Sequence, residues 1–477
     1  MRFLKKNYKI LVLISFALMS LIIGYFHEPW SDEAQSWLIA RDQTVKDIIF
    51  FNASYEGCFP LWILIVKVFI SFGLSYEYIN IISTLIVVIA MYVFLYKTDI
   101  KPVVKVIFPF TFFIFYQYNI IARNYSLLVL AFMILLSLYD KRHIKSASYF
   151  ALLAFTSMIS FHGMLISGCL FFELLVEEIL KFKKDKNINK KVALFSIGLI
   201  LIYLFEIYVL FPRQELLMAM NFEEPFKDNF LHILVKICAV TTNSFFLFLN
   251  IISVVFLSIV LFLVKKHNQN RMAFNLMEIL MIIQLFLIRA ASHHIGILFL
   301  IIIVELLLNK NNKIIEILTV IVLVLYMILN VIACFNEVNG NYSGAKEMAQ
   351  YIKQIEDFEK EDVYAVGYKT TAILPYFERN IFDNRKDAYY LWSSDNLELS
   401  LYVYFYENMN YDTFFKEGKY PKYLLIQNHN LTNKDKKIRE KIERSKLYQL
   451  KYETEGDNFY KASSSETEGY ILYELIK

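Results

Sequence analysis

Glycine and proline are scarce in this chain, with 13 and 8 residues among 477. These residues punctuate turns and linkers, so their shortage argues against long flexible connections between domains. The four cysteines form no Cys-x-x-Cys pair and no cysteine–histidine spacing of a zinc site, so the sequence does not point to that class of metal centre. The chain also lacks internal repeats, low-complexity segments and a basic face on a soluble fold, so nothing indicates a nucleic-acid partner.

Long hydrophobic runs are what the chain has instead. Hydrophobic residues make up 57% of it, against about 45–50% in an average soluble protein. Runs of roughly 17–22 such residues recur between positions 10 and 335, and each is long enough to cross a bilayer. A basic start, Met1 to Lys6, precedes the first run without a small-x-small cleavage site. We therefore predict a multi-pass protein of the cell membrane with an uncleaved first span and a cytoplasmic N-terminus.

The apolar run 59–74 decides the topology, because every later loop changes sides if this run crosses. We interpret it as a segment embedded in the outer face, within an outer loop 27–77. This choice places 21 lysines and arginines in the cytoplasmic pieces and 8 in the outer pieces before residue 336. About eleven spans result, and an odd number leaves the C-terminus outside. The predicted spans are 10–26, 78–96, 105–121, 125–139, 148–161, 164–180, 192–211, 245–264, 272–288, 295–308 and 314–335.

Residues 336–477 differ from the membrane domain 1–335, because charge is dense and hydrophobicity falls to soluble levels. Helical spacing covers 343–358, and short buried strands are predicted at 363–366, 423–426 and 471–475. Helices that alternate with strands are typical of α/β folds. The expected architecture is therefore a mainly α membrane domain followed by a small extracytoplasmic α/β domain.

In this topology the polar residues that interrupt apolar stretches gather on the outer side. They are Asp32, Glu33, Arg123, Asn124, His162, Arg289, His293 and His294. Scattered structural polar groups would fall on both faces, so convergence on one face indicates a single outward-facing site. The acidic pair also has a purely structural explanation, because Ser31 can cap a helix whose first turn carries Asp32 and Glu33.

Several short motifs occur in a characteristic order along the membrane domain. They are Asp32-Glu33 after the first span, Glu56-Gly57-Cys58-Phe59-Pro60-Leu61-Trp62, Ala122-Arg123-Asn124-Tyr125, His162 between two short spans, and Arg289 with His293-His294-Ile295-Gly296. In this order the chain resembles the GT-C-type membrane glycosyltransferases, namely the bacterial relatives of protein O-mannosyltransferases and of lipid A aminoarabinose transferases. The second motif departs from the family's Glu-Gly-His-Pro-Pro-Leu-Trp stretch, because Cys58 and Phe59 replace His-Pro.

The resemblance implies an enzyme that moves a sugar from a polyprenyl phosphate to a hydroxyl of a glycan, lipid or protein acceptor. Asp32 is the expected general base, and Glu33 would orient the acceptor or hold the loop. Four residues are expected to bind the donor phosphate: Arg123, Arg289, His293 and His294. Six are expected to contact substrate: His27, Glu28, Trp37, Glu56, Tyr125 and His162. We expect no cofactor, and a divalent metal is not favoured, because the second outer loop has no acid.

Alternative interpretations remain for these residues. Arg123 and Arg289 can anchor span ends at lipid headgroups, and His162 can form an interhelical hydrogen bond. A transporter or flippase of a lipid-linked saccharide would also need polar groups at membrane level, together with inverted repeats or broken helices. A non-catalytic scaffold whose outer domain binds a partner is the third possibility.

Overall fold

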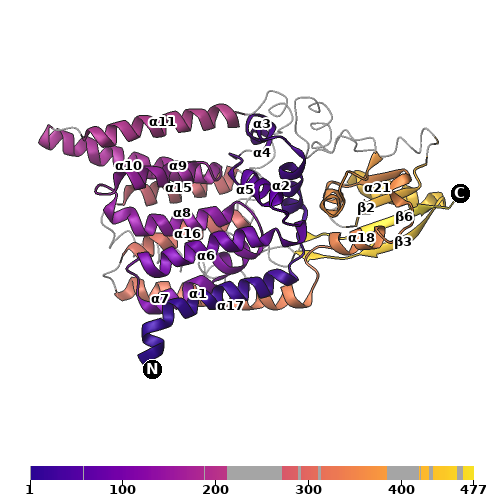
Figure 1. Ribbon diagram of the computed structural model, residues 1–477, viewed down its shortest axis with the longest axis horizontal. Coiled ribbons are helices and arrows are strands. Elements are labelled where there is room, and N and C mark those ends of the chain that lie inside the picture. Colours follow the sequence, from indigo (N-terminus) through magenta and orange to yellow (C-terminus); the bar gives the residue numbers. More distant parts are fainter. Residues whose placement is uncertain are drawn as a thin grey trace.

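The computed structural model describes residues 2–56, 58–186, 189–211, 271–287, 292–309, 313–383, 418, 420–428, 433–458 and 466–476. Within these ranges the chain is mainly helical, with a small sheet near its C-terminus (Figure 1). Among the residues described, five helical segments are long and apolar enough to cross a membrane: Asn7–Phe26, Tyr76–Lys97, Pro102–Ile120, Lys190–Leu210 and Lys313–Asn339. These lengths and compositions are compatible with a membrane protein.

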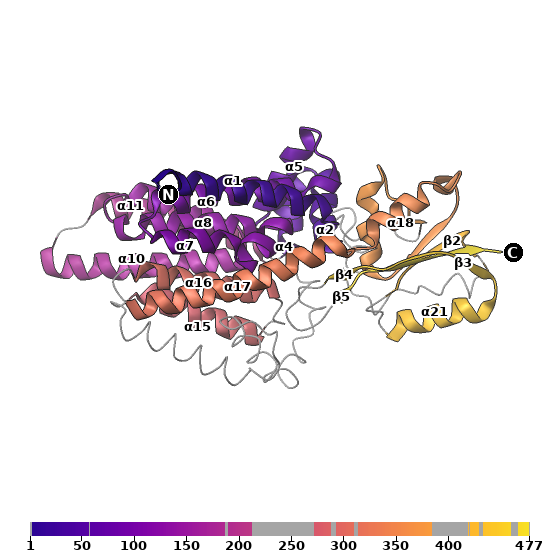
Figure 2. The ribbon, with the colours of Figure 1, turned by 90° about the horizontal axis from the view of Figure 1, so that it is seen from below.

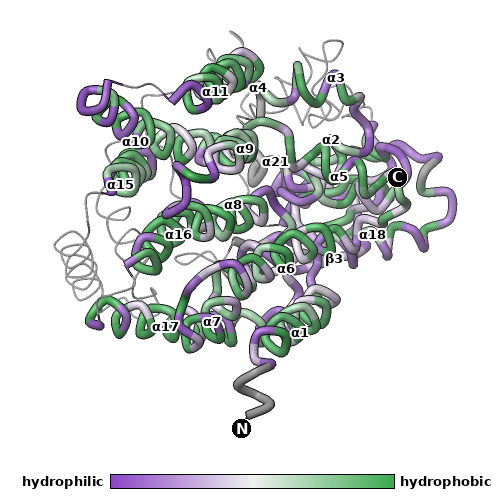
Figure 3. The backbone as a smooth tube through the Cα atoms, turned by 60° about the vertical axis from the view of Figure 1, so that its left-hand side comes forward, coloured by the Kyte–Doolittle hydropathy of each residue, from purple (hydrophilic) through white to green (hydrophobic). Residues whose placement is uncertain are grey.

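Most of the apolar helices, long and short, lie side by side in one bundle (Figures 1 and 2). They are α1 (Arg2–Phe26), α6 (Asn80–Lys97), α8 (Tyr125–Leu138), α9 (Ser146–Ser157), α10 (Phe161–Asp185), α11 (Lys190–Leu210), α15 (Met272–Leu287), α16 (Ser292–Leu308) and α17 (Lys313–Asn339). Hydrophobic residues run along these helices, whereas polar residues gather at the helix ends and in the C-terminal domain (Figure 3). Helices occur at ten of the predicted spans, and the predicted span 245–264 lies outside the described residues.

The predicted span 105–121 is not one regular helix. It begins as α7 (Pro102–Ile107), tightens to the 3₁₀ turn η3 (Phe108–Phe110), and ends as the π-helix η4 (Phe113–Ile120). Pro109 in η3 has no N–H to donate, which breaks the ladder of helical hydrogen bonds. Every residue of η4 is buried, so the irregular backbone is enclosed by protein.

A layer of short helices crosses the end of the bundle that carries the C-terminal domain (Figure 2). It contains α2 (Ser31–Asp42), α3 (Val45–Asp47), η1 (Ile48–Asn52), α4 (Ala53–Glu56), α5 (Leu61–Ser71) and η2 (Tyr76–Tyr78). Helix α5 has 11 residues, which corresponds to about 16 Å at 1.5 Å per residue. The hydrocarbon core is about 30 Å thick, so α5 is too short to cross it.

The C-terminal domain is a four-stranded mixed sheet with helices. Its elements are α18 (Ala345–Ile352), η7 (Phe358–Lys360), β1 (Val363–Val366), η8 (Tyr368–Tyr376), β2 (Tyr423–Gln427), α21 (Asn433–Ser445), β3 (Tyr448–Thr454) and β6 (Tyr470–Leu475), while β4 (Asp457–Asn458) and β5 (Glu466–Thr467) form a separate pair. The strand order is β1-β2-β6-β3, parallel between β1 and β2 and antiparallel elsewhere. The three predicted strands are therefore present, whereas the predicted helix 343–358 is shorter.

The two faces of this sheet have different neighbours. Ala365, Leu425 and Leu472 belong to the same buried cluster as the membrane bundle, whereas Leu424 and Ile471 pack in a second cluster with a residue of α21. Alternate residues of a strand point to opposite faces. One face of the sheet therefore packs toward the bundle, and α21 covers the other (Figure 2).

Candidate active site

A cavity of about 330 Å³ lies at the end of the bundle next to the layer of short helices. This volume falls within the usual range of ligand sites, about 300–1,000 Å³. The following residues line it: Asp32, Ser36, Cys58, Phe59, Pro60, Trp62, Ile63, Arg123, Asn124, Tyr125, Ser160, Phe161, His162, His293 and His294. Six residues of the predicted site are among them, drawn from four segments that are far apart in the sequence.

An ion pair between Asp32 and Arg123 forms one side of the cavity. Arg123 Nη1 donates to Asp32 Oδ2 at 2.5 Å, and the two side chains are 25% and 34% exposed. Burial alone lowers the pKa of the Arg123 guanidinium, but the charge of Asp32 and its neighbours outweighs burial and raises that pKa. Within the described residues, Asp32 Oδ1 and the remaining guanidinium N–H groups have no hydrogen-bond partner, although the guanidinium also lies over the ring of Tyr125. Each side chain therefore keeps polar atoms for a ligand.

Glu33 lies behind the cavity rather than in it. Its side chain is fully buried, and its carboxylate accepts hydrogen bonds from the backbone N–H groups of Trp30 at 3.1 Å and Ala122 at 2.6 Å. The first bond belongs to a capping arrangement at the start of α2. The second joins α2 to the loop that carries Arg123. Glu33 thereby fixes the backbone segments of both members of the ion pair.

His27 links Glu33 to a second buried carboxylate. Its Nε2 lies 3.0 Å from Glu33, and its Nδ1 lies 2.9 Å from Glu337 on α17. Burial lowers the pKa of His27, but the two carboxylates outweigh burial and raise the pKa to about 10. The imidazolium form donates from both ring nitrogens, which matches this geometry. Tyr116 donates its hydroxyl to Glu337, so the network also reaches η4.

Three histidines, His162, His293 and His294, cluster in the wall of the cavity. The rings of His162 and His294 lie 4.9 Å apart, and those of His293 and His294 lie 4.3 Å apart. Ser160 caps α10 by accepting from Gly163 N at 3.1 Å, which places His162 in the first turn. The amide nitrogen of Gln284 lies 2.7 Å from His162 Nε2, consistent with the interhelical hydrogen bond that the sequence left open.

Gly296 lets α16 approach the aromatic wall of η4. A Cβ atom at this position would lie 2.2 Å from the Tyr118 hydroxyl and 2.4 Å from a ring carbon of Phe113. The Tyr118 hydroxyl donates to the His293 carbonyl at 2.6 Å. The small residue and this hydrogen bond together fix the start of α16, and with it the two adjacent histidines, relative to the cavity.

Three residues predicted to contact substrate lie outside the cavity. His27 belongs to the buried network, and the ring of Trp37 packs against Tyr76, 5.5 Å away. Glu28 accepts from Ser343 N at 3.4 Å in the C-terminal domain, and burial raises its pKa to about 7. The sequence could not show that the C-terminal domain covers this part of the loop. Arg289 and the side chain of Glu56 lie outside what the structure describes.

Sequence reasoning missed Ser36 and Phe161 in the cavity, and it noted Asn124 and Trp62 without including them among the predicted site residues. Ser36 lies one helical turn after Asp32, and its hydroxyl donates to the Asp32 carbonyl at 3.3 Å, so helical spacing contained its signal. Asn124 donates to the Ile159 carbonyl at 3.2 Å and joins two of the loops. Trp62 and Phe161 contribute apolar surface, and nothing in their sequence context separates them from interfacial aromatics.

The cavity suits anion binding and proton transfer better than metal binding. Asp32 is the one carboxylate among the lining residues that the structure describes, and no cluster of metal-capable side chains occurs in that part of the chain. A hard divalent cation needs several oxygen ligands. A guanidinium can instead hold a phosphate. The carboxylate beside it, which keeps an unpartnered oxygen, can accept a proton.

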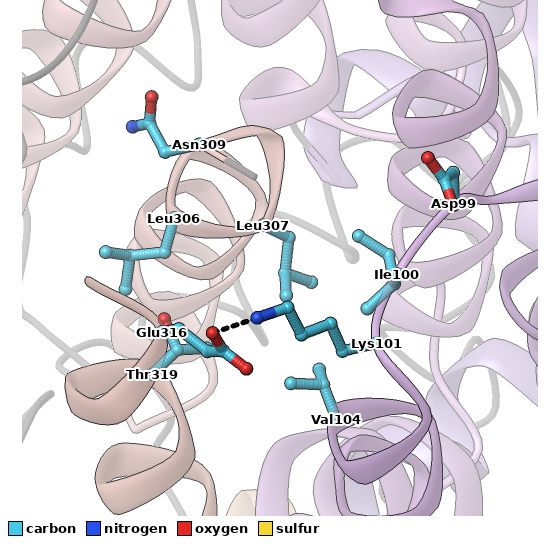
Figure 4. A pocket seen from close by; sticks show the side chains of 9 residues that line it. All are labelled: Asp99, Ile100, Lys101, Val104, Leu306, Leu307, Asn309, Glu316 and Thr319. Carbon is cyan, nitrogen blue, oxygen red and sulfur yellow. Dashed lines mark hydrogen bonds and ion pairs between the residues drawn. The ribbon is translucent and has the colours of Figure 1, made fainter. Parts of the chain in front are cut away.

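A smaller pocket of about 60 Å³ lies at the other end of the bundle (Figure 4). Lys101 before α7 pairs there with Glu316 on α17, while Asp99, Asn309 and Thr319 also line it. The volume is far below that of ordinary ligand sites, about 300 Å³ or more. The Lys101–Glu316 ion pair therefore links the start of α7 to α17, and the pocket does not offer a second ligand site.

Comparison with known proteins places the chain in no family: no protein-family model, no curated protein and no solved structure matches it.

Proposed function

We propose that this protein is a membrane glycosyltransferase that moves a sugar from a polyprenyl-phosphate donor to an acceptor hydroxyl at the outer face of the membrane. The cavity carries this proposal, because it brings a carboxylate, a guanidinium and a histidine cluster together from segments spread between residues 32 and 294. Those are the groups that the GT-C resemblance assigns to the site. The acceptor is a glycan, a lipid or a protein.

The topology in this proposal has about eleven spans, with the N-terminus cytoplasmic and the C-terminal domain outside. The cavity and the C-terminal domain lie at the same end of the bundle, which supports a common, outer location for both. Helix α5 would then lie embedded at that face. A phosphatase fused to the C-terminus should be active. Activity of a C-terminal reporter that works only in the cytoplasm would contradict the topology.

The reaction follows from the ion pair. Asp32 Oδ1 accepts the proton of the acceptor hydroxyl, whose oxygen forms a bond to the anomeric carbon of the donor. The bond between that carbon and the phosphate oxygen breaks, and its electron pair leaves on the polyprenyl phosphate. Arg123 balances the charge of the leaving phosphate with the N–H groups that Asp32 does not use. A positioned general base contributes roughly 10²–10⁴-fold to such a step.

The histidine cluster completes the donor site. His293 and His294 lie at the start of α16, and the ring of His294 lies 4.9 Å from that of His162. Their ring nitrogens can supply hydrogen bonds to phosphate or sugar oxygens. The aromatic rings of Trp62 and Phe161 line the same cavity and can cover an apolar face of the sugar or the start of the prenyl chain.

Mass spectrometry of envelope glycans from cells with and without the gene tests the proposal. Loss of one sugar, restored by the wild-type gene, is the expected result, and an unchanged glycan profile would contradict it. Purified protein in liposomes separates a transferase from a flippase. A transferase releases free polyprenyl phosphate from the donor, whereas a flippase leaves the sugar–phosphate bond intact.

A further inference from the structure

Helix α2 carries Asp32 and depends on the C-terminal domain at its first residue. The backbone N–H of Ser31 donates to both oxygens of Glu468, at 3.1 and 3.3 Å. Glu468 precedes β6 and is fully buried. The first N–H groups of a helix have no partner within the helix, and a carboxylate there also offsets the positive end of its dipole. A residue 436 positions after Asp32 therefore caps the helix that bears it.

Glu468 is itself held in place by its own domain. Ser343 Oγ donates to its carboxylate at 2.7 Å, and Lys369 Nζ lies 3.8 Å from the same group. Its backbone carbonyl accepts from Gly344 N at 2.9 Å. Lys369 is also buried and lies over the ring of Trp30, which directly precedes α2. A buried residue whose carboxylate contacts two side chains of its own domain, and whose carbonyl accepts from a backbone N–H, is a rigid support rather than a mobile side chain.

The other end of α2 is attached to the same domain. Arg41 Nη1 donates to the Phe377 carbonyl at 2.7 Å, just after η8. The rings of Tyr76 and Tyr376 lie 5.1 Å apart, and Tyr76 in turn packs on Trp37 of α2. The C-terminal domain thus contacts both ends of α2 and, through Tyr76, the face of the helix that carries Trp37.

We infer that the C-terminal domain positions the catalytic cavity, and that Glu468 is the positioning residue through which it acts on Asp32. This rests on the proposed function for its catalytic consequence. Without the cap, the first turn of α2 loosens, and the Asp32 carboxylate moves relative to Arg123 and the substrate. A misplacement of about 1 Å at a reacting group lowers a rate by roughly 10²-fold.

The first test measures the helix itself, without any substrate. Hydrogen exchange on the full-length protein in nanodiscs should be about tenfold faster for the first turn of α2 in Glu468→Ala than in the wild type. Glu474→Ala is the matched control, because Glu474 lies on β6, the strand that follows Glu468, and pairs with Lys422 and Lys451 away from α2. Equal exchange in the first turn for Glu468→Ala and Glu474→Ala would overturn the inference.

Two milder variants keep the test decisive if Glu468→Ala does not accumulate as folded protein. Glu468→Gln keeps an oxygen that can accept from Ser31, so exchange should stay within about twofold of the wild type. Ser343→Ala removes one hydrogen bond to Glu468 and no atom of α2, so a rise of about threefold is expected. Faster exchange in Glu468→Gln than in Ser343→Ala would contradict a capping role.

The second test measures transfer from a farnesyl-phosphate monosaccharide. Glu468→Ala should lower kcat at least tenfold while the donor KM stays within about twofold, and Glu468→Gln should restore most of kcat. Full kcat in Glu468→Ala despite a loosened α2 would overturn the positioning role. If the wild type transfers no sugar but α2 still loosens in Glu468→Ala, the proposed function fails and the cap on α2 stands.

Discussion

Asp32 and Glu33 are adjacent acids with opposite environments. The Asp32 carboxylate faces the cavity, is about one third exposed and uses one oxygen for Arg123. The Glu33 carboxylate is fully buried and accepts from Trp30, Ala122 and His27. A carboxylate whose oxygens are already saturated has no capacity left for a substrate, whereas one with an unpartnered oxygen does. This difference indicates that Glu33 supports the fold, whereas Asp32 keeps an acceptor oxygen for the proposed chemistry.

The division follows from helix geometry. Consecutive residues of a helix point about 100° apart, so the first turn of α2 directs Asp32 toward the cavity and Glu33 toward the bundle. Burying Glu33 as an ion is tolerable only because a protonated histidine and two backbone amides surround it. The sequence left two roles open for Glu33, and its contacts match the one in which it holds the loop.

Replacing Asp32 is expected to give the largest change in activity. Asp32→Asn should lower transfer by two to four orders of magnitude, because the amide cannot accept the hydroxyl proton. Folding should be unaffected, since the side chain is part-exposed and its ion pair contributes little. Transfer assays and thermal unfolding of the purified variant measure both quantities. Asp42→Asn, at the other end of the same helix, is the control, and wild-type turnover by Asp32→Asn would remove Asp32 from the mechanism.

Replacing Glu33 should reverse this pattern and act on stability. Glu33→Ala leaves His27 with one carboxylate and removes the carboxylate that accepts from the Trp30 and Ala122 amides. Removing one partner of a buried ion pair costs about 3–5 kcal/mol, so we expect a large fall in the free energy of unfolding. Glu33→Gln, which keeps the hydrogen-bond acceptor, should lose less. A Glu33→Ala protein that is as stable as the wild type but inactive would place Glu33 in the chemistry.

The pH dependence of stability should also come from the buried side of the pair. The pKa of His27 is about 10 in the folded protein, against about 6.5 when unfolded. Because this pKa is raised in the folded protein, protonated His27 contributes its full amount to the free energy of unfolding below pH 6.5. This contribution is lost as the pH rises toward 10. The wild type should therefore lose a few kcal/mol of stability across that range beyond any loss in His27→Gln. An equal change in the free energy of unfolding of the two proteins between pH 6.5 and pH 10 would contradict the charged network.

The sequence predicted the cavity better than its support. Asp32, Arg123, His162 and His294 could be grouped because each interrupts an apolar stretch, and a polar residue at membrane level needs a reason to be there. The roles of His27 and Glu28 could not be predicted, because their partners Glu337 and Ser343 are more than 300 residues away. Contacts of that kind depend on packing, which no local pattern encodes.

The strands of the C-terminal domain were predictable for the same reason as the spans. Hydrophobic residues at 363–366, 423–426 and 471–475 are concentrated in short runs, and all three become neighbours in one sheet. Glu468 has no such signal, because it sits in a charged stretch and looks like a surface acid. Its burial depends on contacts with distant residues, namely Ser343 and Lys369 of its own domain and Ser31 of α2.

Chelation should have the smallest effect on activity. The cavity offers a single carboxylate among its described lining residues, and Arg123 occupies the place where a cation would meet it. A guanidinium repels a divalent cation and can itself balance the leaving phosphate. We therefore expect transfer in EDTA to stay within about twofold of the untreated rate, a change of about 0.4 kcal/mol. Arg123→Gln in the same assay should weaken donor binding much more than EDTA does. Complete loss of transfer in EDTA, restored by magnesium or manganese, would show that a metal rather than Arg123 holds the phosphate. Asp32 would then be a metal ligand rather than a proton acceptor.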